Sequence, residues 1–69
     1  MSRIDLIIYA LEILEGRDRL DISRYENIIS LGHAKPQDYE WYSFHRKRLA
    51  KTINLIGEFR NKKNDKTSV

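Results

Sequence analysis

The chain has no cysteine and only two histidines among its 69 residues. It can form no disulfide, and two histidines are too few to close a structural zinc site without help from carboxylates. A chain this small then depends for its stability on well-packed helices, on self-association or on a partner.

Long apolar runs are also missing. The most apolar stretch, residues 4–14, is interrupted by Asp5 and Glu12, and no small-residue cleavage site follows it. It therefore predicts neither a signal peptide nor a membrane span. Together with the lack of cysteine, this favours an intracellular, cytoplasmic protein without membrane contact.

Groups that carry catalysis are sparse as well. His33 falls in an expected loop and His45 in an expected helix, and the three glycines form no phosphate-binding loop. No pair of histidines, and no pair of glutamate and histidine, has the spacing of helical metal ligands. We therefore expect a protein that is not an enzyme and that has no cofactor and no metal site.

Apolar residues make up 41% of the composition, enough for one packed core and too much for wholesale disorder. The predicted fold class is all-α: a small three-helix bundle with a long C-terminal helix and a short disordered basic tail. In this prediction residues 1–62 form the single helical domain, and residues 63–69 form the flexible basic tail.

The first two helices are predicted from their caps. The first begins at Ser2, a good N-cap residue, and ends at Gly16. Its apolar residues cover more than half of the circumference, which is typical of a central helix. The second helix begins with the capping-box pattern Ser23-x-x-Glu26 and ends at Gly32.

The third helix begins at Pro36, which suits a first helical turn, and is expected to end near residue 62. One side of it is polar, and the other carries two adjoining apolar strips that would contact two helices at once. Its length leaves part of it without a partner inside the chain. The sequence therefore favours either a homodimer or a docked protein partner.

Charge is divided along the chain. Residues 1–44 contain five Lys or Arg and eight Asp or Glu, a balance of −3, whereas residues 45–69 contain eight and two, a balance of +6. The two balances give the net charge of +3. Such a chain can neutralise itself on folding, or it can present its basic end to an anionic partner.

Aromatic and basic residues are concentrated between Tyr39 and Lys51, a segment that includes the single tryptophan. Most of these aromatic side chains fall where a core needs them, whereas Tyr39 lies on the opposite side and is the better candidate for an exposed contact. Arg48 falls within the aromatic strip, where a lone cation is costly. Either its guanidinium reaches solvent or the acidic stripe of Asp5 and Glu12, or the strip is an interface that Arg48 anchors.

The leading hypothesis is a non-catalytic helical interaction protein that binds a larger macromolecular partner and thereby inhibits or adapts it. Chains of this size, without cysteine and with divided charge, are frequent among accessory proteins of phages and mobile elements. The candidate partner-binding residues all come from the aromatic and basic segment: Tyr39, Trp41, Tyr42, Arg46, Lys47, Arg48 and Lys51.

An alternative hypothesis is a nucleic-acid-binding helical protein that contacts phosphates through its basic end. Its candidate residues are Arg46, Lys47, Lys51, Lys62, Lys63 and Lys66. A helix-turn-helix is disfavoured, because Asp38 and Glu40 would face the phosphates at the start of the recognition helix. A third alternative is a structural subunit whose wide apolar faces are buried only in an oligomer.

Overall fold

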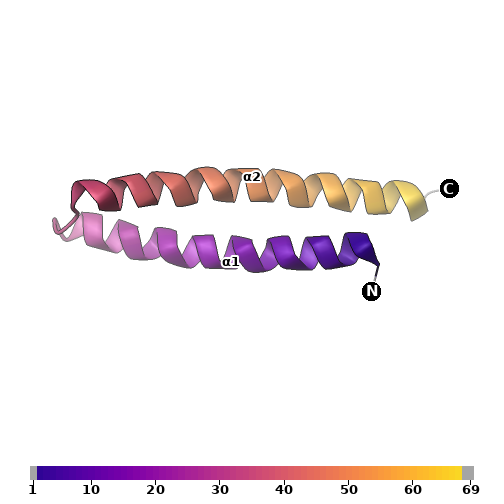
Figure 1. Cartoon of the computed structure of the whole chain (residues 1–69), viewed down its shortest axis with the longest axis horizontal. Helices are drawn as coiled ribbons and strands as arrows, with labels where there is room; N and C mark the ends of the chain where they lie inside the picture. The colour runs from indigo at the N-terminus through magenta and orange to yellow at the C-terminus, as the bar shows by residue number, and fades with distance from the viewer. Residues whose placement is uncertain (1, 68–69) are drawn as a thin grey trace.

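The computed structural model describes the backbone of residues 2–67 and the side chains of residues 2–64. Over this range the chain forms two α-helices, α1 (Arg3–Ser30) and α2 (Pro36–Thr67), joined by a short turn. The helices are antiparallel and lie side by side, so the start of α1 and the end of α2 are at the same end of the molecule (Figure 1). The result is a thin rod of 54 × 17 × 15 Å.

The predicted three-helix bundle is wrong, because the expected first and second helices are one continuous helix. α1 runs through Gly16, through the expected linker and through Ser23. Gly16 keeps a helical backbone, and Arg19 donates a hydrogen bond to Glu15 across it at 2.9 Å. One poor helix residue costs only about 1 kcal/mol, too little to end a helix that is packed along its length.

The outer boundaries predicted from the caps are confirmed. The Ser2 hydroxyl accepts a hydrogen bond from the Asp5 amide at 3.1 Å at the start of α1. Gly32 has a φ of 76° just after α1, the left-handed conformation that commonly ends a helix. Pro36 is the first residue of α2. These residues fix the hairpin turn.

α2 extends beyond the predicted end of the domain. The expected tail begins at residue 63, but the helix continues to Thr67. An ion pair between Lys63 and Asp5, 2.5 Å long, joins this part of α2 to the first turn of α1. The last two positions of the expected tail, residues 68 and 69, lie outside the described residues.

The two helices meet along a seam with heptad spacing. A row of buried or half-buried positions follows alternate steps of four and three residues on each helix. On α1 these positions are 4, 8, 11, 15, 18, 22, 25 and 29, and on α2 they are 38, 42, 45, 49, 52, 56 and 59. This spacing keeps one stripe of each helix against the other, as in a coiled coil. The molecule is therefore an antiparallel coiled-coil hairpin.

The core of this hairpin is small. Within residues 2–64 the buried apolar side chains are Ile8 and Ile56, and the buried polar ones are Asp18 and Thr52. The Thr52 hydroxyl donates to the carbonyl oxygen of Arg48 at 2.8 Å, so its burial leaves no unsatisfied group. The seam covers one stripe of each helix, and large apolar side chains elsewhere on both helices remain exposed.

Two glycine substitutions distinguish the continuous α1 from a break at residue 16. Gly16→Ala should raise the free energy of unfolding by about 1 kcal/mol, because alanine is the better helix residue. An added Cβ at this position meets no atom within 4 Å. Gly32→Ala should lower the free energy of unfolding by about 1 kcal/mol, because φ is positive at this residue. Urea unfolding followed by circular dichroism measures both, and a loss of stability in Gly16→Ala would contradict the continuous helix.

Candidate functional site

The middle of the seam is polar. Asp18 on α1 has no exposed surface, and such a carboxylate is costly to bury unless partners surround it. Arg48 on α2 provides two of the contacts: Nη2 donates to Oδ1 at 2.6 Å, and Nε donates to Oδ2 at 3.0 Å. His45 Nδ1 lies 2.9 Å from Oδ1. Because an ionised carboxylate only accepts, this nitrogen of His45 carries a proton.

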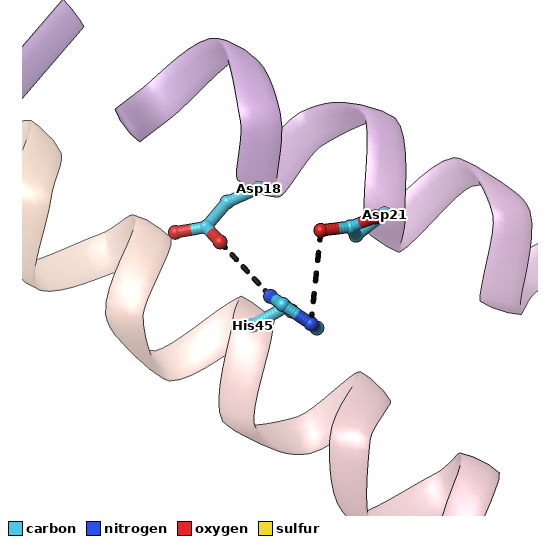
Figure 2. Close-up of side chains that lie close together, drawn as sticks. All are labelled: Asp18, Asp21 and His45. Atoms are coloured by element: carbon cyan, nitrogen blue, oxygen red, sulfur yellow. Dashed lines mark hydrogen bonds and ion pairs between the residues drawn. The ribbon is translucent and has the colours of Figure 1, made fainter. Parts of the chain in front are cut away.

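Helical spacing brings a second carboxylate to the same place. Asp18 and Asp21 are three residues apart on α1, as His45 and Arg48 are on α2, so each pair shares one helix face. Figure 2 shows the His45 ring reaching from α2 to both carboxylates of α1. Its Nε2 lies 3.8 Å from Asp21 Oδ2. We call Asp18, Asp21, His45 and Arg48 the seam cluster.

Aromatic rings enclose the seam cluster on one side. The His45 ring stacks on Tyr25 with centroids 5.9 Å apart and meets Phe44 edge to face at 5.5 Å. The guanidinium carbon of Arg48 lies 5.0 Å from the centroid of Phe44. These rings exclude water from one side of the ion pair, and they hold the cation by its attraction to an aromatic face. The His45 side chain is 11% exposed, so it belongs to the interior.

The seam cluster changes the protonation of its members. Hydrogen bonds from Arg48 hold the pKa of Asp18 below its ordinary value of 3.8; burial opposes this effect, and His45 adds to it. Asp18 in turn raises the pKa of Arg48. Both groups are therefore charged at neutral pH, and they form an ion pair between a buried carboxylate and a half-buried guanidinium.

Three members of the cluster are also potential metal ligands. One ligand atom each from Asp18, Asp21 and His45 can be chosen so that all lie within 4.8 Å of one another. Both oxygens of Asp18, however, already accept hydrogen bonds from Arg48. A divalent cation on Asp18 would have to compete with the guanidinium, so these residues suit their internal cation better than a metal.

The structure separates the predicted partner-binding residues into two that hold the helices together and five that are exposed on α2. Tyr42 and Arg48 serve the hairpin itself, since the Tyr42 hydroxyl donates to Glu26 at 3.3 Å and Arg48 belongs to the seam cluster. Arg46 lies over the Tyr42 ring, 5.4 Å from its centroid. The remaining candidates are exposed on α2: Tyr39, Trp41, Lys47 and Lys51.

The predicted phosphate-binding cations are dispersed. Lys62 lies 5.2 Å from the centroid of the Phe59 ring, and Lys63 pairs with Asp5. The side chain of Lys66 lies outside the described residues. Within residues 2–64, Lys47 and Lys51 form no hydrogen bond, ion pair or ring contact. These two lysines are one helical turn apart on the same face.

Sequence reasoning missed the seam cluster. Of the two alternatives for Arg48, an acidic partner on the first helix is close to what is found, but that partner is Asp18. Glu12 pairs instead with Arg60 at 3.3 Å. The heptad spacing of apolar positions continues past residue 16, and following it would have placed Asp18 on the seam. The prediction instead ended the first helix at Gly16, which placed Asp18 in a linker.

Comparison of the chain with protein-family models, with curated proteins and with solved structures gives no match. Neither helix, over the described residues, has an apolar stretch long enough to cross a membrane. The site must therefore be interpreted from its own geometry.

Replacing the buried carboxylate tests the seam cluster. Asp18→Asn should lower the free energy of unfolding at neutral pH by about 2 kcal/mol, because it removes one partner of a buried ion pair. The pKa of Asp18 is lower in the folded state, so its stabilisation is complete well above pH 3.8 and is lost as the pH falls through the folded value. The Asn variant should therefore show a flatter decline of stability in acid, measured by urea unfolding at several pH values.

Glu40→Gln is the matched control, because Glu40 is exposed and the same type of substitution removes its charge. Its acid limb should follow that of the unmodified chain. A smaller acid dependence will remain in Asp18→Asn, since Lys63 also lowers the pKa of Asp5. An unchanged acid limb in Asp18→Asn would show that the cluster does not stabilise the hairpin.

Proposed function

We propose that the chain is a non-catalytic helical interaction protein that binds a larger protein through the outer surface of α2. The observation that carries this proposal is the exposed group Trp41, Phe44, Lys47 and Lys51, which we call the aromatic–lysine surface. Trp41 is 53% exposed and Phe44 is 46% exposed. Their rings meet edge to face with centroids 5.8 Å apart.

Shallow grooves make this surface a suitable contact. One is lined by Glu40, Trp41 and Phe44, and the next is lined by Phe44, Lys47, Arg48 and Lys51. Aromatic side chains bring large contact areas at little cost in conformational entropy, and they are enriched where proteins bind one another. A partner with an apolar centre and an acidic rim would complement both the rings and the lysines.

The seam cluster also contacts the aromatic–lysine surface, through Arg48 and Phe44. Arg48 is held by Asp18 and its guanidinium carbon lies 5.0 Å from the centroid of Phe44, so the ring packs against a cation whose position the hairpin fixes. A contact held in place before binding loses less entropy when the partner arrives. The same cluster argues against catalysis, since its carboxylate, imidazole and guanidinium are engaged with one another. Binding would inhibit or adapt the partner by covering part of its surface.

Charge reversal at the lysines tests the proposal. The double variant Lys47→Glu, Lys51→Glu should lose a protein that the unmodified chain captures from extracts of its source cells, because it would repel an acidic rim. A control with Arg3→Glu and Lys35→Glu carries the same change of charge on exposed residues elsewhere and should keep the captured protein. If both variants capture the protein equally well, the aromatic–lysine surface is not the contact.

The single tryptophan provides a direct readout of the same contact. Trp41 fluorescence should shift to shorter wavelength when the captured protein, once purified, is added, because an exposed indole is then covered. Trp41→Ala should weaken binding by about tenfold or more, as expected of an aromatic anchor. An unshifted emission on saturating addition would place the contact elsewhere on the hairpin.

The nucleic-acid alternative is tested with the same variants. Lys47 and Lys51 are the exposed cations that favour it, and phosphate binding would weaken steeply as salt is raised. Fluorescence anisotropy of labelled duplex DNA, single-stranded DNA and RNA across a salt series measures this. Salt-sensitive binding that the Lys47→Glu, Lys51→Glu variant loses would favour nucleic acid over an acidic protein. No binding at low ionic strength would eliminate the alternative.

A further inference from the structure

α1 carries a second apolar row that the hairpin does not use. Leu6, Ile13 and Leu20 follow one another at intervals of seven residues, and they are 58%, 47% and 69% exposed. Ala10 and Arg17 fall between them, so the row 6, 10, 13, 17, 20 has the same alternating steps of four and three as the seam. At 100° per residue its centre lies roughly 160° around the helix from the centre of the seam.

The exposed area of the hairpin is larger than a monomer of this mass normally shows. Its accessible surface is 5607 Å². A compact monomer of 8.3 kDa is expected to expose about 4,600 Å², so the excess is about 1,000 Å². A stable dimer removes about 800 Å² from each partner. The excess is therefore what one standard interface with a second copy would cover.

The composition of the row suits contact with itself. A two-fold axis places the same surface on both sides of an interface, and the row repeats the coiled-coil spacing that such packing requires. Arg17 is its one charged residue.

We infer that this outer row of α1 is the interface of a homodimer, a layer of four helices in which α1 is the inner helix of each hairpin. The row lies on α1 and the aromatic–lysine surface on α2, so the inference does not rest on the proposed function. Each α1 is then covered on two sides, by its own α2 and by the second copy.

Sedimentation equilibrium of the purified chain tests the dimer. The unmodified chain should change from monomer to dimer as its concentration rises. Ile13→Glu should raise the dissociation constant by at least about 100-fold, because two-fold symmetry places the lost apolar contact in the interface twice. Ile53→Glu is the matched control: Ile53 is 43% exposed on α2 and receives the same change. Circular dichroism checks that both variants remain helical.

A cross-link locates the interface independently. Since the chain has no cysteine, Ile13→Cys introduces a single thiol. Residue 13 is the middle of the row and meets its own copy whether the helices pair parallel or antiparallel, so oxidation or a short bifunctional reagent should join two chains. Ile53→Cys should not cross-link. A monomer at all concentrations, a dimer abolished equally by Ile53→Glu, or cross-linking only through position 53 would each overturn the inference.

Discussion

The hairpin depends on the ion pair between Asp18 and Arg48. Several features hold α1 and α2 in one register: the short turn that contains Gly32, the Asp18–Arg48 pair, and the pair of Lys63 with Asp5. A slip would leave the Asp18 carboxylate buried without its guanidinium, which costs several kcal/mol. Replacing such a pair by apolar side chains is often neutral for stability, whereas removing one partner is costly, so the pair penalises any register other than the one that the turn sets.

That register also determines which side chains of α2 are exposed at the surface. With Arg48 fixed on Asp18, its guanidinium carbon lies 5.0 Å from Phe44, and the ring of Phe44 is directed to the surface beside Trp41. Lys47 and Lys51 lie beside them. The exposed rings thus pack beside the Asp18–Arg48 pair, and a change at Asp18 would act on the aromatic–lysine surface as well as on the hairpin. The two effects separate by measuring binding under conditions where the variant is fully folded.

Local signals in the sequence predicted the ends of the structure but not its middle. Ser2, Gly32 and Pro36 act as the sequence indicates, because caps and turns depend on neighbouring backbone groups. Gly16 and the Ser23 capping box also carry local signals for a helix end and a helix start. Packing along the seam overrides both, so α1 continues through them. Helix wheels likewise placed Trp41 and Phe44 in a core. Only the position of the partner helix decides which apolar side chains are covered, and here the seam runs between the two strips, covering Leu49, Thr52 and Ile56 and leaving Trp41 and Phe44 exposed.

The apolar circumference of the first helix predicted a central helix, and the hairpin satisfies that pattern only in part. One heptad row, through Ile8 and Asp18, meets α2, whereas the row through Leu6, Ile13 and Leu20 faces outward. A further helix in the same chain was the simplest partner for the outer row, but the residues expected to form the second helix complete α1 instead. In the proposed homodimer a second copy would supply the missing helix, because a two-fold axis places the same row on both sides of the interface. The proposed homodimer would thus account for the outer apolar row of α1, which the hairpin alone leaves exposed.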